Sequence, residues 1–207
     1  PAAALPPYDD ALLRRELALF PDWCVTRECG VTWTDAETAT WKDACDQLVA
    51  AALAQPVVAV HRDWMPRNLM VADPNPGILD FQDAVCGPIA YDVASLLRDA
   101  FISWEEEQEL DWAIRYWEAA RQAGLPLSED FGAFWRDFEW MGVQRQIKVL
   151  GIFARLCHRD GKAGYVDDMP LVMAYLRAAC GRYRELAPMI LLLDALEGRE
   201  QRVGYTF

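Results

Sequence analysis

The sequence predicts a mainly helical domain that carries a small β-hairpin. Apolar residues recur at helical spacing from Tyr91 onward. The β-branched run Val57–Val60, and two short apolar runs on either side of the turn-forming residues 73–77, indicate strands. Apolar residues make up 53% and charged residues 25% of the 207 residues, a balance typical of a folded domain and not of a disordered chain.

Two helices are expected before the first strand. Apolar residues at helical spacing between positions 12 and 20 predict the first helix, which Pro21 is expected to end. Thr34 and Glu37 form a T-x-x-E capping box, which predicts a second helix through residue 53. The hairpin strands are expected at residues 69–72 and 78–81.

The rest of the chain is expected to be helical. Ser103 and Glu106 have the spacing of a capping box, and Gly124 and Pro126 are expected to follow the end of that helix. The expected helices cover residues 91–101, 103–123, 128–158, 169–186 and 188–196. Together these predictions describe one domain, residues 1–207, with no internal linker.

Composition excludes several classes of protein. The net charge of −12 argues against a nucleic-acid-binding or anionic-membrane surface, which needs an excess of Lys and Arg. No apolar run is long enough to span a bilayer, and no signal peptide is apparent. The six cysteines form no C-x-x-C pair, so we expect reduced thiols and a cytoplasmic protein. The two histidines offer little for a zinc site.

One stretch indicates phosphoryl-transfer chemistry. Residues 61–68 read H-R-D-x-x-x-x-N, and Asp80 opens D-F-x-D beyond the hairpin. In this pattern one carboxylate, Asp63, accepts the proton of an attacking hydroxyl, while Asn68 and Asp80 hold Mg²⁺ against the phosphates of ATP. Isolated Asp and Asn residues near turns are usually caps, but four spaced positions agree here with a strand–loop–hairpin context. His61 is expected to be a packed structural residue.

The segment from residue 57 to 99 resembles the catalytic and metal loops of the protein-kinase-like superfamily, in its aminoglycoside-phosphotransferase branch. Residues 87–94, G-P-I-A-Y-D-V-A, fit the G-x-x-x-Y-D-[VL]-A stretch that follows the metal loop in that branch. The resemblance implies the C-terminal lobe of a kinase-like fold, with Asp63 as base, Asn68 and Asp80 as magnesium ligands, and Asp92 as a buttress of the catalytic loop. Arg62 stands where the branch usually has glycine, and its role is open.

The short connection after the metal loop favours a small-molecule acceptor. Ten residues separate Asp80 from Tyr91, with no Ser, Thr or Tyr among them. A protein kinase needs a longer activation segment there, to dock a peptide and carry a phosphosite.

The motifs H-R-D-W-M-P-R-N-L-M and L-D-F-Q-D-A, residues 140–162 and the terminal R-V-G-Y-T-F are similar to a narrower group. This group comprises the bacterial anomeric sugar kinases that phosphorylate N-acetylmuramate and N-acetylglucosamine in peptidoglycan recycling. The resemblance implies a sugar hydroxyl as acceptor.

Further residues are candidates for binding the substrate. Arg145, Lys148, Arg155 and Arg159 share one arc of a helical wheel, and we call them the basic stripe. It is either a solvated face or, through Arg145 and Lys148, a surface that pairs with the carboxylate of N-acetylmuramate. The residues that flank the catalytic positions are also candidates: Arg62, Trp64, Arg67, Gln82 and Asp83. Trp64 is equally well explained as a packing anchor, and Asp83 as a turn cap.

A complete kinase of this type also needs a glycine-rich lid over the phosphates and a lysine that pairs with them. Residues 1–60 contain one glycine, Gly30, and one lysine, Lys42. We therefore expect that the nucleotide-holding N-terminal β-lobe is absent from this chain. The absent β-lobe would be the partner of the lobe that these residues form. We also expect the 207 residues alone to be inactive.

Two alternatives remain. Another small-molecule kinase would act on an aminoglycoside, choline or another amino sugar, and the sign of the pocket charge separates these acceptors. A nucleotide-binding regulatory pseudokinase is the alternative of a different class, which retention of Asp63, Asn68 and Asp80 disfavours.

Overall fold

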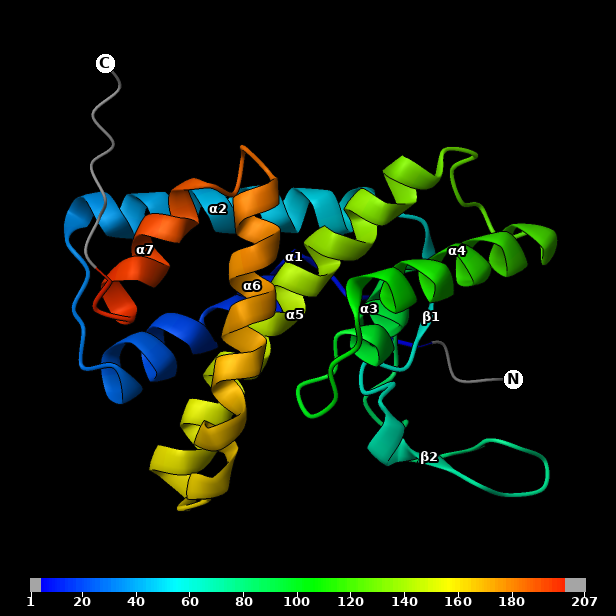
Figure 1. The fold of residues 1–207 in the computed structure, drawn as a ribbon, viewed down its shortest axis with the longest axis horizontal. Coiled ribbons are helices and arrows are strands. Elements are labelled where there is room, and N and C mark those ends of the chain that lie inside the picture. Colours follow the sequence, from blue (N-terminus) through cyan, green and yellow to red (C-terminus); the bar gives the residue numbers. More distant parts are fainter. Residues whose placement is uncertain (1–4, 200–207) are drawn as a thin grey trace.

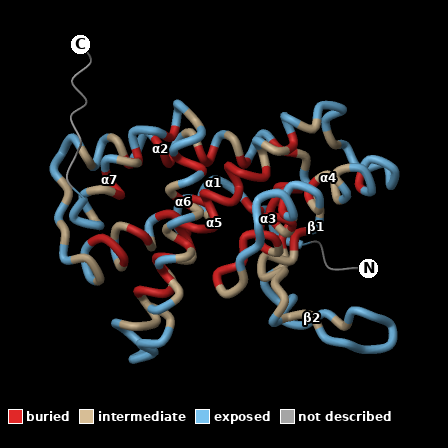
Figure 2. Tube along the Cα trace, viewed as in Figure 1, coloured by how far each residue is buried: buried red, intermediate tan, exposed pale blue. Residues whose placement is uncertain are grey.

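The computed structural model describes residues 5–199, and its centre is one long helix. Helix α5 (Phe131–Asp160) crosses the body and contacts most other helices (Figure 1). Every residue from Phe138 to Lys148 is buried, so this part of α5 is covered on all sides (Figure 2). Such a helix is a core element and not a surface helix with one solvated face.

The N-terminal helices pack against α5. Helix α1 (Asp10–Leu17) is capped by Asp9. It is followed by η1 (Phe20–Glu28), a π-helix with Pro21 at its start. Pro21 was expected to end the first helix, and this prediction is wrong: proline is tolerated in a first turn, where its missing N–H is not required. Helix η1 lies so close to α5 that a Cβ on Gly151 would come 2.5 Å from the carbonyl carbon of Leu19.

Helix α2 (Asp35–Ala54) begins as expected. The Thr34 side chain accepts the N–H of Glu37, and Glu37 accepts the N–H of Thr34 at 2.8 Å, so the predicted capping box is confirmed. Helix α2 contacts α5, α7 and strand β4.

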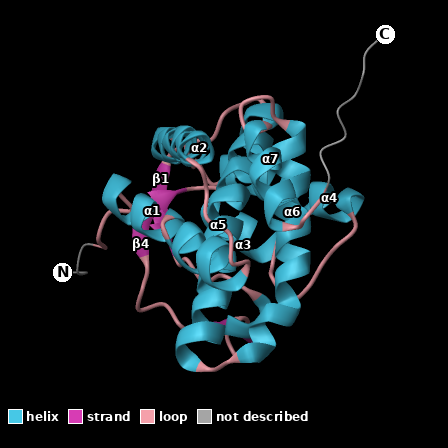
Figure 3. Cartoon of the chain, turned by 90° about the vertical axis from the view of Figure 1, so that its left-hand side faces the viewer, coloured by secondary structure: helices cyan, strands magenta, loops and turns pink. Residues whose placement is uncertain are grey.

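Four short strands form two antiparallel pairs. Strand β1 (Val57–Val60) was expected and pairs with β4 (Val85–Pro88), which was not. Figure 3 shows this pair at one edge of the helical body. Pro7 bridges to Cys86, so the N-terminal segment extends along β4.

The predicted hairpin is present but its strands are shorter than expected. Strand β2 (Leu69–Met70) pairs with β3 (Gly77–Ile78), and the hairpin projects from the body (Figure 1). Its connecting residues are exposed (Figure 2).

The remaining helices follow the predicted order. They are α3 (Tyr91–Leu97), α4 (Glu106–Gln122), α5, the 3₁₀-helix η3 (Ala163–Asp168), α6 (Met169–Arg182) and α7 (Pro188–Leu196). The predicted capping box at Ser103 is wrong, because Glu105 is the N-cap of α4 and no side chain caps it. Helix α5 begins after Asp130, whose side chain accepts the N–H of Gly132 at 2.8 Å.

Within residues 5–199, no helix is both long and apolar enough to cross a membrane. All six cysteines are free thiols. The terminal motif at residues 202–207 lies outside the described residues.

Candidate active site

The loop after β1 is held from below by one carboxylate. Asp92, in the first turn of α3, accepts the backbone N–H of His61 at 2.7 Å and of Arg62 at 3.0 Å. Burial raises the pKa of Asp92, and the two N–H groups only partly offset this effect. The imidazole of His61 packs edge-on against Trp64, with ring centroids 5.5 Å apart. These contacts fix the backbone immediately before Asp63.

Asn68 joins the catalytic loop to the metal loop. Its side-chain NH₂ donates to the backbone oxygen of Asp63 at 2.9 Å, and its backbone oxygen accepts the N–H of Leu79 at 3.0 Å. The first contact ties Asn68 to Asp63, and the second brings the residue before Asp80 alongside. Because the amide nitrogen of Asn68 is engaged, its amide oxygen is the atom left to face a cation.

The donor set fits magnesium. Asp63 and Asn68 are half-buried, whereas Asp80 is exposed. Gln82 donates to one carboxylate oxygen of Asp80 at 2.7 Å, which leaves the other oxygen open. An amide oxygen and a carboxylate oxygen are hard ligands of the kind Mg²⁺ takes beside substrate phosphates.

An apolar cavity of about 630 Å³ lies against the catalytic loop. Its walls include Trp64, Asp92, Trp104, Trp112 and Tyr116. The two indoles Trp104 and Trp112 meet edge-to-face at 4.9 Å, and the Tyr116 hydroxyl donates to the backbone oxygen of Ile89 at 3.2 Å. Sequence reasoning found Trp64 but missed the three aromatic residues contributed by α4 and the loop before it, because nothing local in the sequence distinguishes them from core aromatics.

The basic stripe is buried at its N-terminal end. Arg145 is 4% and Lys148 is 8% exposed, so the interpretation as a solvated face is wrong for both residues. The Lys148 ammonium lies 3.2 Å from Glu16 and donates to the Tyr91 hydroxyl at 3.0 Å. Lys148 therefore neutralises an internal carboxylate, and the cavity described above lacks both residues.

Glu16 of α1 is a buried acidic residue beside Arg62 that sequence reasoning missed. It is 5% exposed, and its carboxylate accepts from Tyr8 and Arg62 and pairs with Lys148. Burial raises the pKa of Glu16, but the charge of Lys148, the Tyr8 hydroxyl and the Arg62 guanidinium outweigh it and hold that pKa below its usual value.

The other substrate candidates lie apart from the cavity. The Arg67 guanidinium stacks over the Phe101 ring, 3.4 Å from its centroid. Gln82 bonds to Asp80, as described above, and the backbone oxygen of Asp83 accepts from the Arg62 guanidinium at 3.2 Å. Only Trp64 of the flanking candidates lines the apolar cavity.

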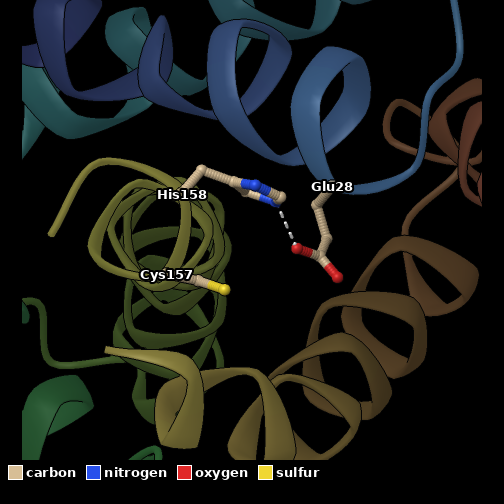
Figure 4. A group of neighbouring side chains, drawn as sticks. All are labelled: Glu28, Cys157 and His158. Atoms are coloured by element: carbon tan, nitrogen blue, oxygen red, sulfur yellow. Dashed lines mark hydrogen bonds and ion pairs between the residues drawn. The ribbon is translucent and has the colours of Figure 1, made fainter. Parts of the chain in front are cut away.

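One group of three possible metal ligands lies elsewhere in the described part of the chain. Glu28, at the end of η1, meets Cys157 and His158 of α5, with donor atoms within 4.8 Å of one another (Figure 4). His158 Nε2 and Glu28 Oε2 are 2.7 Å apart, so these two groups already satisfy each other. We interpret the group as a hydrogen-bonded histidine and glutamate beside a free thiol.

A helical lobe in which one asparagine joins the predicted catalytic loop to the predicted metal loop is the arrangement expected of a phosphotransferase of the kinase-like class. Residues 1–127 match the phosphotransferase enzyme family, APH, and the chain belongs to this family.

Curated relatives share this sequence at high identity. The chain is 54% identical over 195 residues to an N-acetylmuramate/N-acetylglucosamine kinase of Pseudomonas putida, covering 94% of this chain and 58% of that protein. It is 54% identical over 204 residues to the protein of the same name in Neisseria meningitidis, covering 98% of this chain and 61% of that protein. The Caulobacter vibrioides protein of that name is 33% identical over 174 residues, covering 82% of this chain and 46% of that protein. The chain thus spans less than two thirds of the length of these relatives.

Among solved structures, a Plasmodium vivax ethanolamine kinase is similar, with a TM-score of 0.52 and 16% identity. The match covers 84% of this chain and 49% of that one, and it shows the fold alone. The predicted fold class, a mainly helical kinase-like lobe with a small β-hairpin, is confirmed, and the structure adds the β1–β4 pair.

Proposed function

We propose that this chain is the catalytic, acceptor-binding lobe of an ATP-dependent sugar kinase. The reaction transfers the γ-phosphoryl group to the anomeric hydroxyl of N-acetylmuramate or N-acetylglucosamine. The observation that carries the proposal is the pair of hydrogen bonds by which Asn68 joins Asp63 to the segment of Asp80. The names of relatives 54% identical to the chain support the choice of sugar.

In this mechanism Asp63 orients the sugar hydroxyl and accepts its proton as the bond to phosphorus forms. Asn68 and Asp80 would hold Mg²⁺, which would supply positive charge against the phosphates of ATP. Asp92 keeps its carboxylate on the loop backbone and takes no proton from the substrate. Positioning of these groups supplies most of the rate enhancement expected for such a site.

The apolar cavity supports a sugar acceptor. Pyranose rings present C–H faces that pack against indole and phenol rings, and Trp104, Trp112 and Tyr116 offer such surfaces beside the catalytic loop. The one carboxylate in its wall, Asp92, already accepts two N–H groups. A polycationic aminoglycoside would need unpaired carboxylates in the pocket, so this acceptor is disfavoured.

Choline is the second candidate acceptor. An aromatic-walled cavity also suits a quaternary ammonium group through cation–π attraction. The identity to the named sugar kinases favours the sugar over choline.

The exposed hairpin supports the proposal that a nucleotide-holding lobe covers this one. Large apolar side chains gather there at high exposure: Met70 at 50%, Val71 at 97%, Leu79 at 48% and Phe81 at 66%. Exposed apolar surface of this kind marks a contact with another part of a protein. We propose that sequence beyond these 207 residues supplies the β-lobe, and we call a chain of the relatives' length the full-length protein.

The test is a ³¹P NMR screen of the full-length protein with Mg-ATP and four acceptors. We expect N-acetylmuramate and N-acetylglucosamine each to give a phosphomonoester signal coupled to the anomeric proton, while choline and an aminoglycoside give none. Phosphate on choline or on the aminoglycoside, with the sugars unchanged, would refute the proposed acceptor. Bound nucleotide without transfer to any acceptor would instead favour a regulatory pseudokinase.

A further inference from the structure

Arg62 is held in a backbone conformation that few side chains adopt. Its φ is 76°, in the left-handed region that favours glycine. An arginine here is strained unless surrounding contacts over-determine it, and such strain clusters at functional sites. Its backbone N–H is fixed by Asp92, but that contact would be equally available to a glycine. The reason for a side chain at this position must therefore lie in what the guanidinium touches.

The guanidinium of Arg62 connects two separate parts of the site. One nitrogen, Nη1, donates to the backbone oxygen of Asp83 at 3.2 Å, in the loop that carries the metal ligand Asp80. The other, Nη2, is paired with the carboxylate of Glu16 on α1. The Arg62 side chain is 15% exposed: its pair with Glu16 is part-buried, whereas its contact with the Asp83 backbone oxygen is exposed.

Glu16 in turn ties α1 to the core and to the N-terminal segment. One carboxylate oxygen faces both Arg62 and Lys148, and the other accepts from the Tyr8 hydroxyl. Gln144 of α5 donates to the same hydroxyl at 3.3 Å. A buried carboxylate with cationic partners on two elements sets the separation of those elements, because neither partner can move without leaving a charge unpaired.

Tyr8 is fixed to the strand that follows the metal loop. The backbone N–H of Tyr8 donates to the backbone oxygen of Cys86 at 2.7 Å. A Cβ added to Gly87 would come 2.9 Å from the Cβ of Tyr8, so the two segments are in close contact. These contacts form a ring of connected segments. Arg62 and Glu16 join the catalytic loop to α1, and Glu16 and Tyr8 join α1 to the N-terminal segment. Tyr8 joins that segment to β4, which follows the metal loop, and Arg62 joins the metal loop back to the catalytic loop.

We propose that the Arg62–Glu16 pair is a positioning device that sets the distance between Asp63 and Asp80. Neither residue touches the substrate; each acts through the loop it holds. The inference rests on the proposed function in that the positioned groups are those of the phosphotransferase site. It gives Arg62 a role that a glycine at the same position would lack.

The key variant is Arg62→Gly in the full-length protein. Glycine relieves the left-handed backbone and leaves Glu16 paired with Lys148 and Tyr8, so the variant is expected to fold. We expect kcat to fall about 10–100-fold, because small misplacements of catalytic groups have effects of this size. The KM values for sugar and ATP are expected to stay within about threefold, and Arg62→Lys to recover part of kcat. Wild-type kcat in Arg62→Gly would overturn the proposal.

Arg14→Ala is the matched control, because Arg14 is also an arginine paired with acids, including one of α1, but contacts neither loop. Its kcat is expected to equal that of the wild type. In a double-mutant cycle, Arg62→Gly and Glu16→Gln are expected to be non-additive, and additive losses would show that the two residues do not act as a pair.

Amide hydrogen exchange supplies a readout that needs no acceptor, so it separates this inference from the proposed function. We expect faster exchange at residues 61–68 and 79–84 in Arg62→Gly and no change in Arg14→Ala. Unchanged exchange in Arg62→Gly would overturn the positioning role even if the substrate proved to be another small molecule.

Discussion

At the scale of single residues, the site is built from two left-handed backbone positions. Arg62 has a φ of 76° and Asp80 a φ of 67°. Arg62 immediately precedes the proposed base Asp63, and Asp80 is itself a proposed magnesium ligand. Aspartate tolerates this region because its short side chain bonds locally, whereas arginine does not. The sequence revealed the residue types needed for phosphoryl transfer, since Asp63, Asn68 and Asp80 are separated by short spacings. It could not reveal Glu16, because no local pattern links it to Arg62 or Lys148.

A second residue-scale consequence concerns Asp137 of α5. Burial raises the pKa of its carboxyl to about 6, and the neighbouring Arg136 only partly offsets this effect. The folded-state pKa lies above the unfolded value of about 4, so the folded protein holds this proton more tightly. The free energy of unfolding therefore falls as pH rises from about 4 to 6, and this loss of stability persists in full at neutral pH.

Asp137→Asn should remove that deficit. We expect the variant to exceed the wild type by about 1–3 kcal/mol in urea unfolding at pH 7.5, with the advantage fading toward pH 4. An advantage of equal size at every pH would contradict the assignment.

At the scale of elements, local signals predicted what local interactions determine. The capping box fixed the start of α2, and β-branched residues fixed β1. Strand β4 was missed because V-C-G-P has no strand pattern and forms only by pairing with β1. The solvated-face interpretation of the basic stripe is wrong for Arg145 and Lys148, because the middle of α5 is buried all round, but it holds for Arg159, which is exposed. Tertiary contacts, and not the periodicity of the sequence, determine whether a short strand forms and whether a helix face is buried.

The close approach of η1 and α5 gives a test at this scale. Gly151→Ala would place a Cβ 2.5 Å from the Leu19 backbone, so η1 must move. We expect a loss of about 1–3 kcal/mol in unfolding free energy. Gly181→Ala on α6 is the matched control, since its Cβ would meet no atom within 4 Å and should stabilise by about 0.5–1 kcal/mol. Equal effects of the two substitutions would show that the close contact is unimportant.

At the scale of the whole molecule, one helical body supports two loops that must act together. Helix α5 supplies Lys148, α3 supplies Asp92, α1 supplies Glu16, and the N-terminal segment supplies Tyr8. The proposed nucleotide lobe would meet this body at the exposed apolar hairpin. The predicted inactivity of the 207 residues alone stays a prediction, as does the cytoplasmic location.

The most direct test of the account is the turnover of Asp63→Asn in the full-length protein with saturating N-acetylglucosamine and Mg-ATP. Asparagine keeps the shape of the side chain but cannot accept the hydroxyl proton, and Asn68 still bonds to the unchanged backbone oxygen of residue 63. The account predicts a fall in kcat of about 10²–10⁴-fold, with ATP affinity retained. A kcat for Asp63→Asn within about threefold of the wild type would contradict the central claim that Asp63 is the base.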